Sequence, residues 1–201
     1  PGGEEIPGRR YAQVAAPSEA VLQRLDVDLR GIFFGPPDHS REETVDENSF
    51  RDMYGVLWRR PEGGQYINVL GPFQQGEPTL ADLERHPWPD PRDPGRTRGM
   101  LERARYLRQE TDYAVVLSLP QGVGSYCWML RGFSEYFCDL IDNPAFAEGL
   151  MDHVVEVSAG LAVAALEQVG EYVDVVVYPD DLGMQETCLM RPEMYRRLVK
   201  P

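Results

Sequence analysis

Two adjacent carboxylates, Asp180 and Asp181, follow the apolar run at 173–178. Carboxylates at the carboxyl end of a buried strand can stabilise positive charge that develops on a bound substrate. Side chains of adjacent residues on an extended strand point to opposite sides, so both can face a site only if the chain has already turned. We take both as candidate catalytic acids; the alternative is that they cap or solvate a loop.

Two arginines and two glycines lie where they could receive an anionic substrate. Arg30 lies near the start of the strand candidate 29–34, and Arg131 lies one helix-length after the loop that follows 114–119; either guanidinium could bind an anion or form a structural ion pair. Gly122 and Gly183 fall in the loops after the apolar runs, where a missing side chain lets backbone or substrate approach closely. A simple turn explains these glycines equally well.

Three aromatic side chains complete the candidate site. Trp128, Tyr126 and Tyr178 could form a wall against a flat or methylated ligand, although a tryptophan on a helix also suits the core. Gln185 shares a loop with the two carboxylates and is a further candidate for substrate binding.

The sequence offers little for a metal. The cysteines, Cys127, Cys138 and Cys188, form no Cys-x-x-Cys pair and are expected to be small buried apolar residues. The three histidines have no paired ligand spacing with each other or with the cysteines. We expect no metal site within this sequence.

The elements that must position these residues alternate along the chain. Apolar runs at 114–119 and 173–178 predict parallel strands covered on both faces, and 29–34 is a further strand candidate. Helical spacing covers 97–110, 125–141 and 144 to about 170, and a last helix begins at Pro192. This alternation predicts an α/β fold whose ligand loops are 119–125 and 178–188.

The N-terminal half is less regular. Residues 18–26 predict a short helix with Ser18 as its N-cap, and 79–85 predicts another. Two β-rich runs, 52–60 and 65–70, flank Pro61-Glu62-Gly63-Gly64 and predict a β-hairpin that decorates the main fold.

Composition excludes some classes of partner. The net charge is −13, which repels a phosphate backbone, so nucleic acid is not expected as a partner. No stretch approaches about 18 apolar residues, and the opening ten residues lack a signal-peptide pattern. We therefore expect a cytoplasmic protein with a small-molecule substrate and no membrane contact.

From about Ala15 onward, the order of segments resembles the uroporphyrinogen decarboxylase superfamily. The resemblance rests on SEAVLQRLDVDLRGI, PQGVGSYCWMLRG, DVVVYPDDLGMQ and RPEMYRRLVKP. It implies a (β/α)8 TIM barrel with an N-terminal β-hairpin elaboration. A complete barrel needs about 250 residues, so we expect residues 1–201 to be one domain, the N-terminal part of such a barrel, cut off within a helix.

The sequence also departs from the decarboxylases. The position of their catalytic aspartate lies near Phe34-Gly35-Pro36, with no carboxylate before Asp38, and Trp128 stands where they have an active-site tyrosine. The loop Tyr178-Pro179-Asp180-Asp181-Leu182-Gly183 looks more like the methyltransferase-like branch of the superfamily.

Three functions follow from this resemblance. The first is decarboxylation of a tetrapyrrole or related carboxylated substrate, in which a carboxylate stabilises a protonated pyrrole, arginines pair with carboxylates and no cofactor is needed. The second is methyl transfer with zinc, a corrinoid and a corrinoid protein as partner; the zinc ligands of that branch lie in a C-terminal half outside this sequence. The third is a non-catalytic ligand-binding barrel. The sequence leaves the oligomeric state open.

Overall fold

The computed structural model describes residues 10–12, 17–39, 42–120 and 122–201. Its centre is a three-stranded sheet of β1 (Leu29–Phe33), β6 (Ala114–Ser118) and β7 (Val175–Val177), in the order β1-β6-β7 and parallel throughout. The strands are separated in sequence by helices, as parallel pairing requires. The predicted α/β class with a parallel sheet is confirmed.

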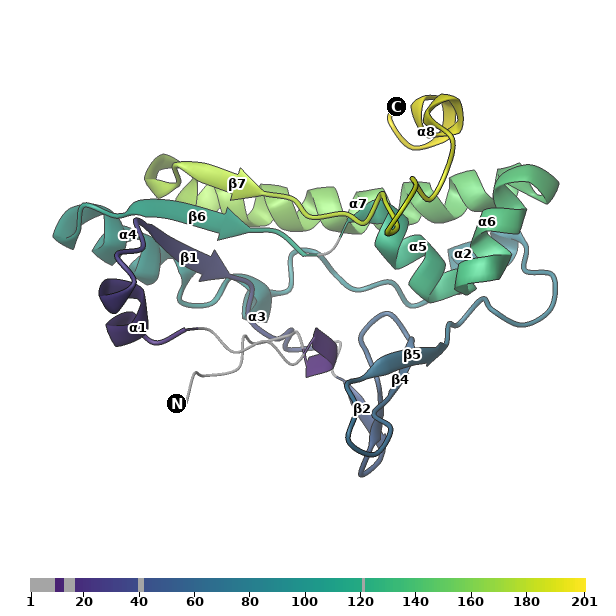
Figure 1. The fold of residues 1–201 in the computed structure, drawn as a ribbon, viewed down its shortest axis with the longest axis horizontal. Helices are drawn as coiled ribbons and strands as arrows, with labels where there is room; N and C mark the ends of the chain where they lie inside the picture. The colour runs from purple at the N-terminus through teal and green to yellow at the C-terminus, as the bar shows by residue number, and fades with distance from the viewer. Residues whose placement is uncertain (1–9, 13–16, 40–41, 121) are drawn as a thin grey trace.

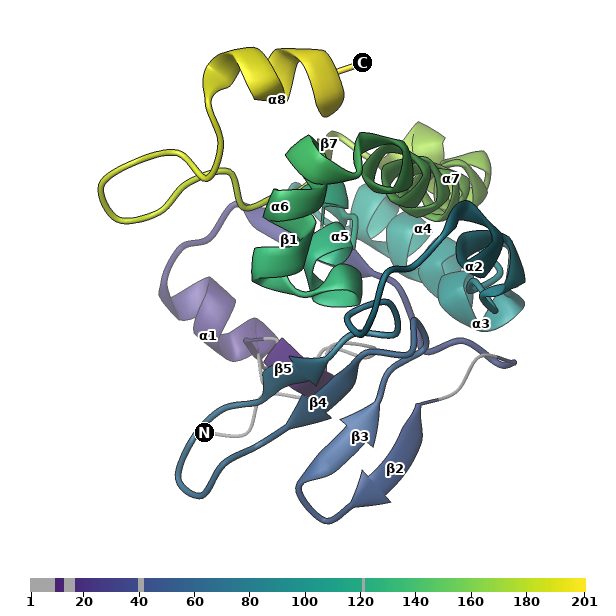
Figure 2. The same cartoon turned by 90° about the vertical axis from the view of Figure 1, so that its right-hand side faces the viewer.

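Helices cover one face of this sheet. α4 (Met100–Glu110) packs against β1 and β6, and the long α7 (Pro144–Val169) packs against α4. Figures 1 and 2 show α7 running along the sheet on the same side as α4. Burial alternates along β6, where Val115 and Leu117 are buried and their neighbours are partly exposed. Within the described residues, β6 is fully buried on one face and only partly covered on the other, so the prediction that 114–119 is covered on both faces was wrong there.

The third strand departs further from its prediction. Val175, Val176 and Val177 are all exposed, because β7 is the last strand in the sheet order and pairs only with β6 among the described strands. The prediction of a buried strand at 173–178 was wrong for the described chain. An apolar sequence shows that a strand is suited to burial, but burial also requires a neighbouring element that covers the strand.

The predicted helix at 125–141 is two helices. α5 (Val123–Arg131) and α6 (Phe133–Asp142) are separated by Gly132, whose φ of +98° lies outside the helical region and favours glycine. The start of α7 agrees with the sequence, since Asn143 is the N-cap and Pro144 the first helical residue. A short 3-10 turn, η2 (Gly170–Tyr172), leads from α7 to β7.

A second sheet lies apart from the first, below it in Figure 1. It contains β2 (Glu43–Asp46), β3 (Ser49–Arg51), β4 (Leu57–Arg59) and β5 (Ile67–Leu70), all antiparallel, in chain order. The predicted hairpin is the β4–β5 pair, and the sequence reading missed the two strands before it.

The remaining elements are short. They are η1 (Arg10–Ala12), α1 (Glu19–Arg24), α2 (Leu80–Arg85), α3 (Pro94–Thr97) and α8 (Pro192–Leu198), which stands away from the body in Figures 1 and 2. Ser18 is the N-cap residue of α1, but its side chain makes no capping hydrogen bond. The predicted helix at 97–110 begins only at Met100, because Arg98 and Gly99 separate it from α3.

Two expectations from composition need correction. The helical stretch Pro144–Tyr172 is long and apolar enough, by length and composition alone, to cross a membrane, whereas the sequence reading found no such stretch. One face of that helix, including Leu150, Val154 and Leu161, is buried in the core of this fold.

The cysteines were all expected to be buried. Cys127 is buried as expected, but Cys138 and Cys188 are exposed. Residues 1–9, where no signal peptide was expected, lie outside the described part.

Candidate functional site

The carboxyl ends of the three parallel strands lie level with one another. Phe33 pairs with Ser118, and Ser118 pairs with Val177, so β1, β6 and β7 end at one edge of the sheet. The loops that leave this edge carry the residues that sequence reasoning selected after β6 and β7. Ligands of open α/β sheets bind beyond this edge, which makes it the candidate site.

Asp180 connects the loop after β7 to the first turn of α5. Its carboxylate accepts hydrogen bonds from the amides of Gly124 and Ser125, each at 3.0 Å, and from the Ser125 hydroxyl at 2.7 Å. The amides in the first turn of a helix have no partner within the helix, and a negative charge is favourable there. The observed role of Asp180 is therefore to cap α5.

The neighbours of Asp180 strengthen this connection. The Tyr178 hydroxyl accepts a hydrogen bond from the Val123 amide at 2.9 Å. A Cβ on Gly122 would lie 2.3 Å from Asp180 side-chain carbons and 2.6 Å from the Pro179 carbonyl oxygen, so only glycine permits this approach. The missing side chain of Gly122 therefore lets the loop after β6 pack closely against the loop after β7.

The other residues selected after β7 are exposed. The Asp181 amide donates to Ser125 Oγ at 3.3 Å, while the Asp181 residue is exposed. Gly183 and Gln185 belong to a small turn in which the Met184 amide donates to the Thr187 carbonyl at 2.7 Å. Of the two candidate acids, Asp181 is the one whose carboxylate remains open to solvent.

The three aromatic residues do not form one wall. Tyr126 is buried, with its ring 4.5 Å from that of Tyr54, and burial raises its pKa well above the ordinary value. Trp128 lies edge-on to Phe133 at 5.7 Å, and its buried Nε1 has no partner among the described residues. No ring contact in the described chain joins any two of Trp128, Tyr126 and Tyr178.

Both candidate arginines are buried and form ion pairs and hydrogen bonds within the protein. Arg131 is buried; its Nε lies 2.6 Å from Asp139 Oδ2, and its Nη1 donates to the Phe73 carbonyl at 2.7 Å. Arg30 is 1% exposed, lies near the amino end of β1, and forms an ion pair of 2.7 Å with Glu19. Its guanidinium carbon is also 3.5 Å from the centre of the Tyr113 ring. Arg30 is thus remote from the edge where the loops meet.

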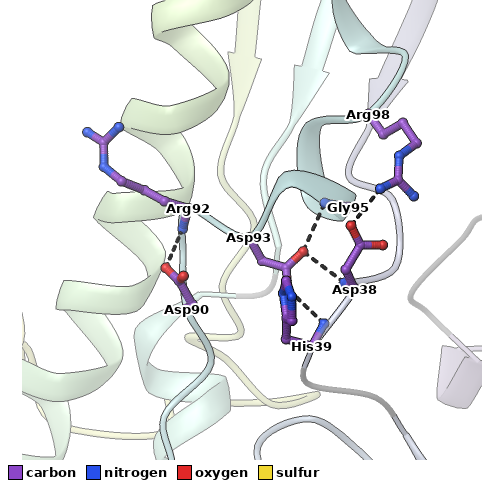
Figure 3. Close-up of polar contacts among 7 residues, drawn as sticks. All are labelled: Asp38, His39, Asp90, Arg92, Asp93, Gly95 and Arg98. Carbon is purple, nitrogen blue, oxygen red and sulfur yellow. Dashed lines mark hydrogen bonds and ion pairs between the residues drawn. The ribbon is translucent and has the colours of Figure 1, made fainter.

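The loop after β1 holds a polar cluster that sequence reasoning missed (Figure 3). Asp93, which is 2% exposed, accepts hydrogen bonds from the amides of Gly95, Asp38 and His39 at 2.9, 2.8 and 2.9 Å. Its Oδ2 also lies 3.0 Å from His39 Nδ1. Asp38 is in turn paired with Arg98 at 2.5 Å. The signal was Asp93-Pro94, an N-cap followed by a first-turn proline, the same pattern that marked Asn143-Pro144.

The electrostatics of Asp93 follow from these contacts. Burial acts to raise its pKa, but the three amides and the imidazole that donate to it outweigh burial and hold the pKa well below the ordinary value. Asp93 is therefore an ionised carboxylate that can act only as an acceptor.

A zinc ion does not fit the described residues. Within 10–12, 17–39, 42–120 and 122–201, no three His, Cys, Asp or Glu side chains gather as a metal site requires.

Comparisons with known proteins give little similarity. No protein-family model matches this sequence, and no curated protein matches it. Among solved structures, a methyltransferase from Methanosarcina mazei is similar with a TM-score of 0.47 and 21% sequence identity. The similarity covers 73% of this chain and 41% of that chain, so this chain spans less than half the length of that protein.

Proposed function

We propose that this chain supplies part of the active site of an enzyme that transfers a methyl group to or from a small molecule. The site lies at the carboxyl edge of β1, β6 and β7, and the residues from the loops after these strands shape it. The methyl donor or acceptor is a corrinoid, carried by a partner protein, as the resemblance to the methyltransferase-like branch suggests.

One observation favours methyl transfer over decarboxylation. Decarboxylation of a carboxylated tetrapyrrole needs free arginines to bind the substrate carboxylates. Arg30 and Arg131 instead form ion pairs with Glu19 and Asp139. Methyl transfer makes no such demand on these two arginines.

The proposal includes a (β/α)8 barrel. The uncovered side of the sheet carries the exposed side chains of Leu29 and Phe33 on β1, and β7 exposes all three of its valines. Further strand–helix units pairing with these edges would bury that surface, and the same units would bring the zinc ligands that the described residues lack.

The test is a direct assay of the full-length protein. Purified protein is incubated with methylcobalamin and 2-mercaptoethanol, and the methylated thiol is measured by mass spectrometry. Formation of methyl thioether above the protein-free rate supports methyl transfer. A parallel incubation with a carboxylated porphyrinogen tests the alternative: release of CO2 there, without methyl transfer, would overturn the proposal in favour of decarboxylation.

A further inference from the structure

The polar cluster after β1 contains an aspartate–histidine pair with a fixed geometry. Asp93 Oδ2 accepts hydrogen bonds from both the main-chain amide and Nδ1 of His39, at 2.9 and 3.0 Å. Two bonds from one residue to one oxygen fix the ring as well as the backbone. Figure 3 shows the imidazole beneath the Asp93 carboxylate, in the loop that follows β1.

This geometry determines which ring nitrogen carries the hydrogen. Because Asp93 is ionised and acts only as an acceptor, Nδ1 of the neutral imidazole is assigned the hydrogen. The lone pair of the neutral ring is then on Nε2. The side chain of His39 is 79% exposed while that of Asp93 is 2% exposed, so most of the imidazole is open to solvent.

The charged neighbours of His39 are themselves paired. Asp93 is positioned to stabilise an imidazolium, and Asp38, which precedes His39 in the loop, is paired with Arg98. The buried Arg96 donates to the Gly35 carbonyl at 2.8 Å and lies over the Phe34 ring. A carboxylate that orients an imidazole through Nδ1 and leaves Nε2 free is the arrangement of general bases in enzymes.

We infer that His39 and Asp93 form a proton-transfer pair, in which Nε2 of His39 takes the proton of a thiol substrate. The S–H bond breaks, its electron pair stays on sulfur, and the proton forms the Nε2–H bond. Asp93 stabilises the resulting imidazolium, and the thiolate is the nucleophile that accepts the methyl group. This inference rests on the proposed methyl transfer for its substrate class.

A thiol is the acceptor that suits an imidazole base. The S–H proton of a thiol is more acidic than the O–H proton of an alcohol, so its transfer to an imidazole is less unfavourable. The placement also fits, because the loop leaves β1 at the same edge as the loops after β6 and β7.

The kinetic test compares His39→Asn with the wild-type full-length protein, again with methylcobalamin and 2-mercaptoethanol. Asparagine keeps a donor for Asp93 but has no titrating nitrogen. We expect kcat at pH 7 to fall about 100-fold with little change in KM for the thiol. The deficit should shrink at pH 10, where the thiol is already ionised. Arg92→Gln, which removes an exposed ion pair with Glu167, should retain wild-type kcat.

A second measurement separates this inference from the proposed function. Two-bond ¹H–¹⁵N spectra of the three histidine rings should show His39 protonated on Nδ1 in the neutral form and altered in Asp93→Asn. An Nε2–H tautomer, or a His39→Asn enzyme with wild-type kcat and pH profile, would overturn the inference. If the wild-type protein transfers no methyl group, both the proposed function and the thiol substrate are rejected. The tautomer measured by NMR then decides by itself whether His39 and Asp93 form a proton-accepting pair.

Discussion

Asp180 accepts hydrogen bonds from both the main-chain amide and the hydroxyl of Ser125, which lies 55 residues earlier in the chain. The contact joins the loop after β7 to the first turn of α5, across the edge where the parallel strands end. A residue that looked like a catalytic acid in sequence is, in the fold, a capping residue that positions two loops.

Removing the Asp180 carboxylate should destabilise the protein. Asp180→Ala leaves the amides of Gly124 and Ser125 without their acceptor, and loss of a cap costs about 1–2 kcal/mol of unfolding free energy. Asp181→Ala is the matched control; its exposed carboxylate should contribute less than about 0.5 kcal/mol. Urea denaturation measures both. Equal losses for the two variants would contradict the capping role.

Gly122 should tolerate no side chain. The Cβ of Gly122→Ala would lie 2.3 Å from Asp180 side-chain carbons, so the loop after β7 must move, at a cost of about 1–3 kcal/mol. Gly170→Ala is the control, because Gly170 has helical φ and ψ and the nearest atom to its added Cβ is 3.9 Å away. We expect that variant to be neutral or to gain about 0.5 kcal/mol. Thermal unfolding of the two variants would show the contrast, and a stable Gly122→Ala would refute the close approach.

The parts of the fold that the sequence predicted are those governed by local rules. Periodicity located β1, β6 and α7, and a cap followed by proline located the start of α7 at Pro144. The exposure of β7 could not be predicted, because burial depends on what packs against a strand and not on the strand itself.

The candidate site was predicted less well for a related reason. A charged residue near a strand end looks the same in sequence whether it binds a substrate or a partner within the chain. Arg131 could be assigned only once Asp139 and the Phe73 carbonyl were seen beside it. His39 and Asp93 are 54 residues apart, so no local pattern joins them.

The buried ion pair of Arg131 with Asp139 should be costly to break on one side. Arg131→Met leaves the carboxylate of Asp139 buried without its cation and should lower the unfolding free energy by about 3 kcal/mol. Adding Asp139→Leu to that variant should recover part of the loss, because no unpaired charge remains. Arg92→Met, at an exposed pair, should cost less than about 1 kcal/mol. A double variant no more stable than Arg131→Met would argue against an unpaired charge as the cause.

His86 should make the stability of the fold depend on pH. Its ring lies 4.9 Å from Phe73 and 4.7 Å from Trp88, and its buried Nε2 has no partner among the described residues. Burial lowers the pKa of His86, and the charge of His153 adds to this, while a hydrogen bond with the Tyr54 backbone opposes it. The folded state therefore favours the neutral ring.

The direction of the pH effect follows from that shift. A histidine in the unfolded chain titrates near about 6.5 and takes up a proton before the folded protein does, so stability is fully present above that pH. It falls as the pH drops from about 7 through the unfolded value toward the lowered folded one. His86→Asn should be less stable at pH 7 but should lose less on acidification, measured by urea unfolding from pH 8 to pH 5. His153→Asn should keep most of the wild-type slope, because burial of His86 is the larger cause; an unchanged slope in His86→Asn would assign the effect to other groups.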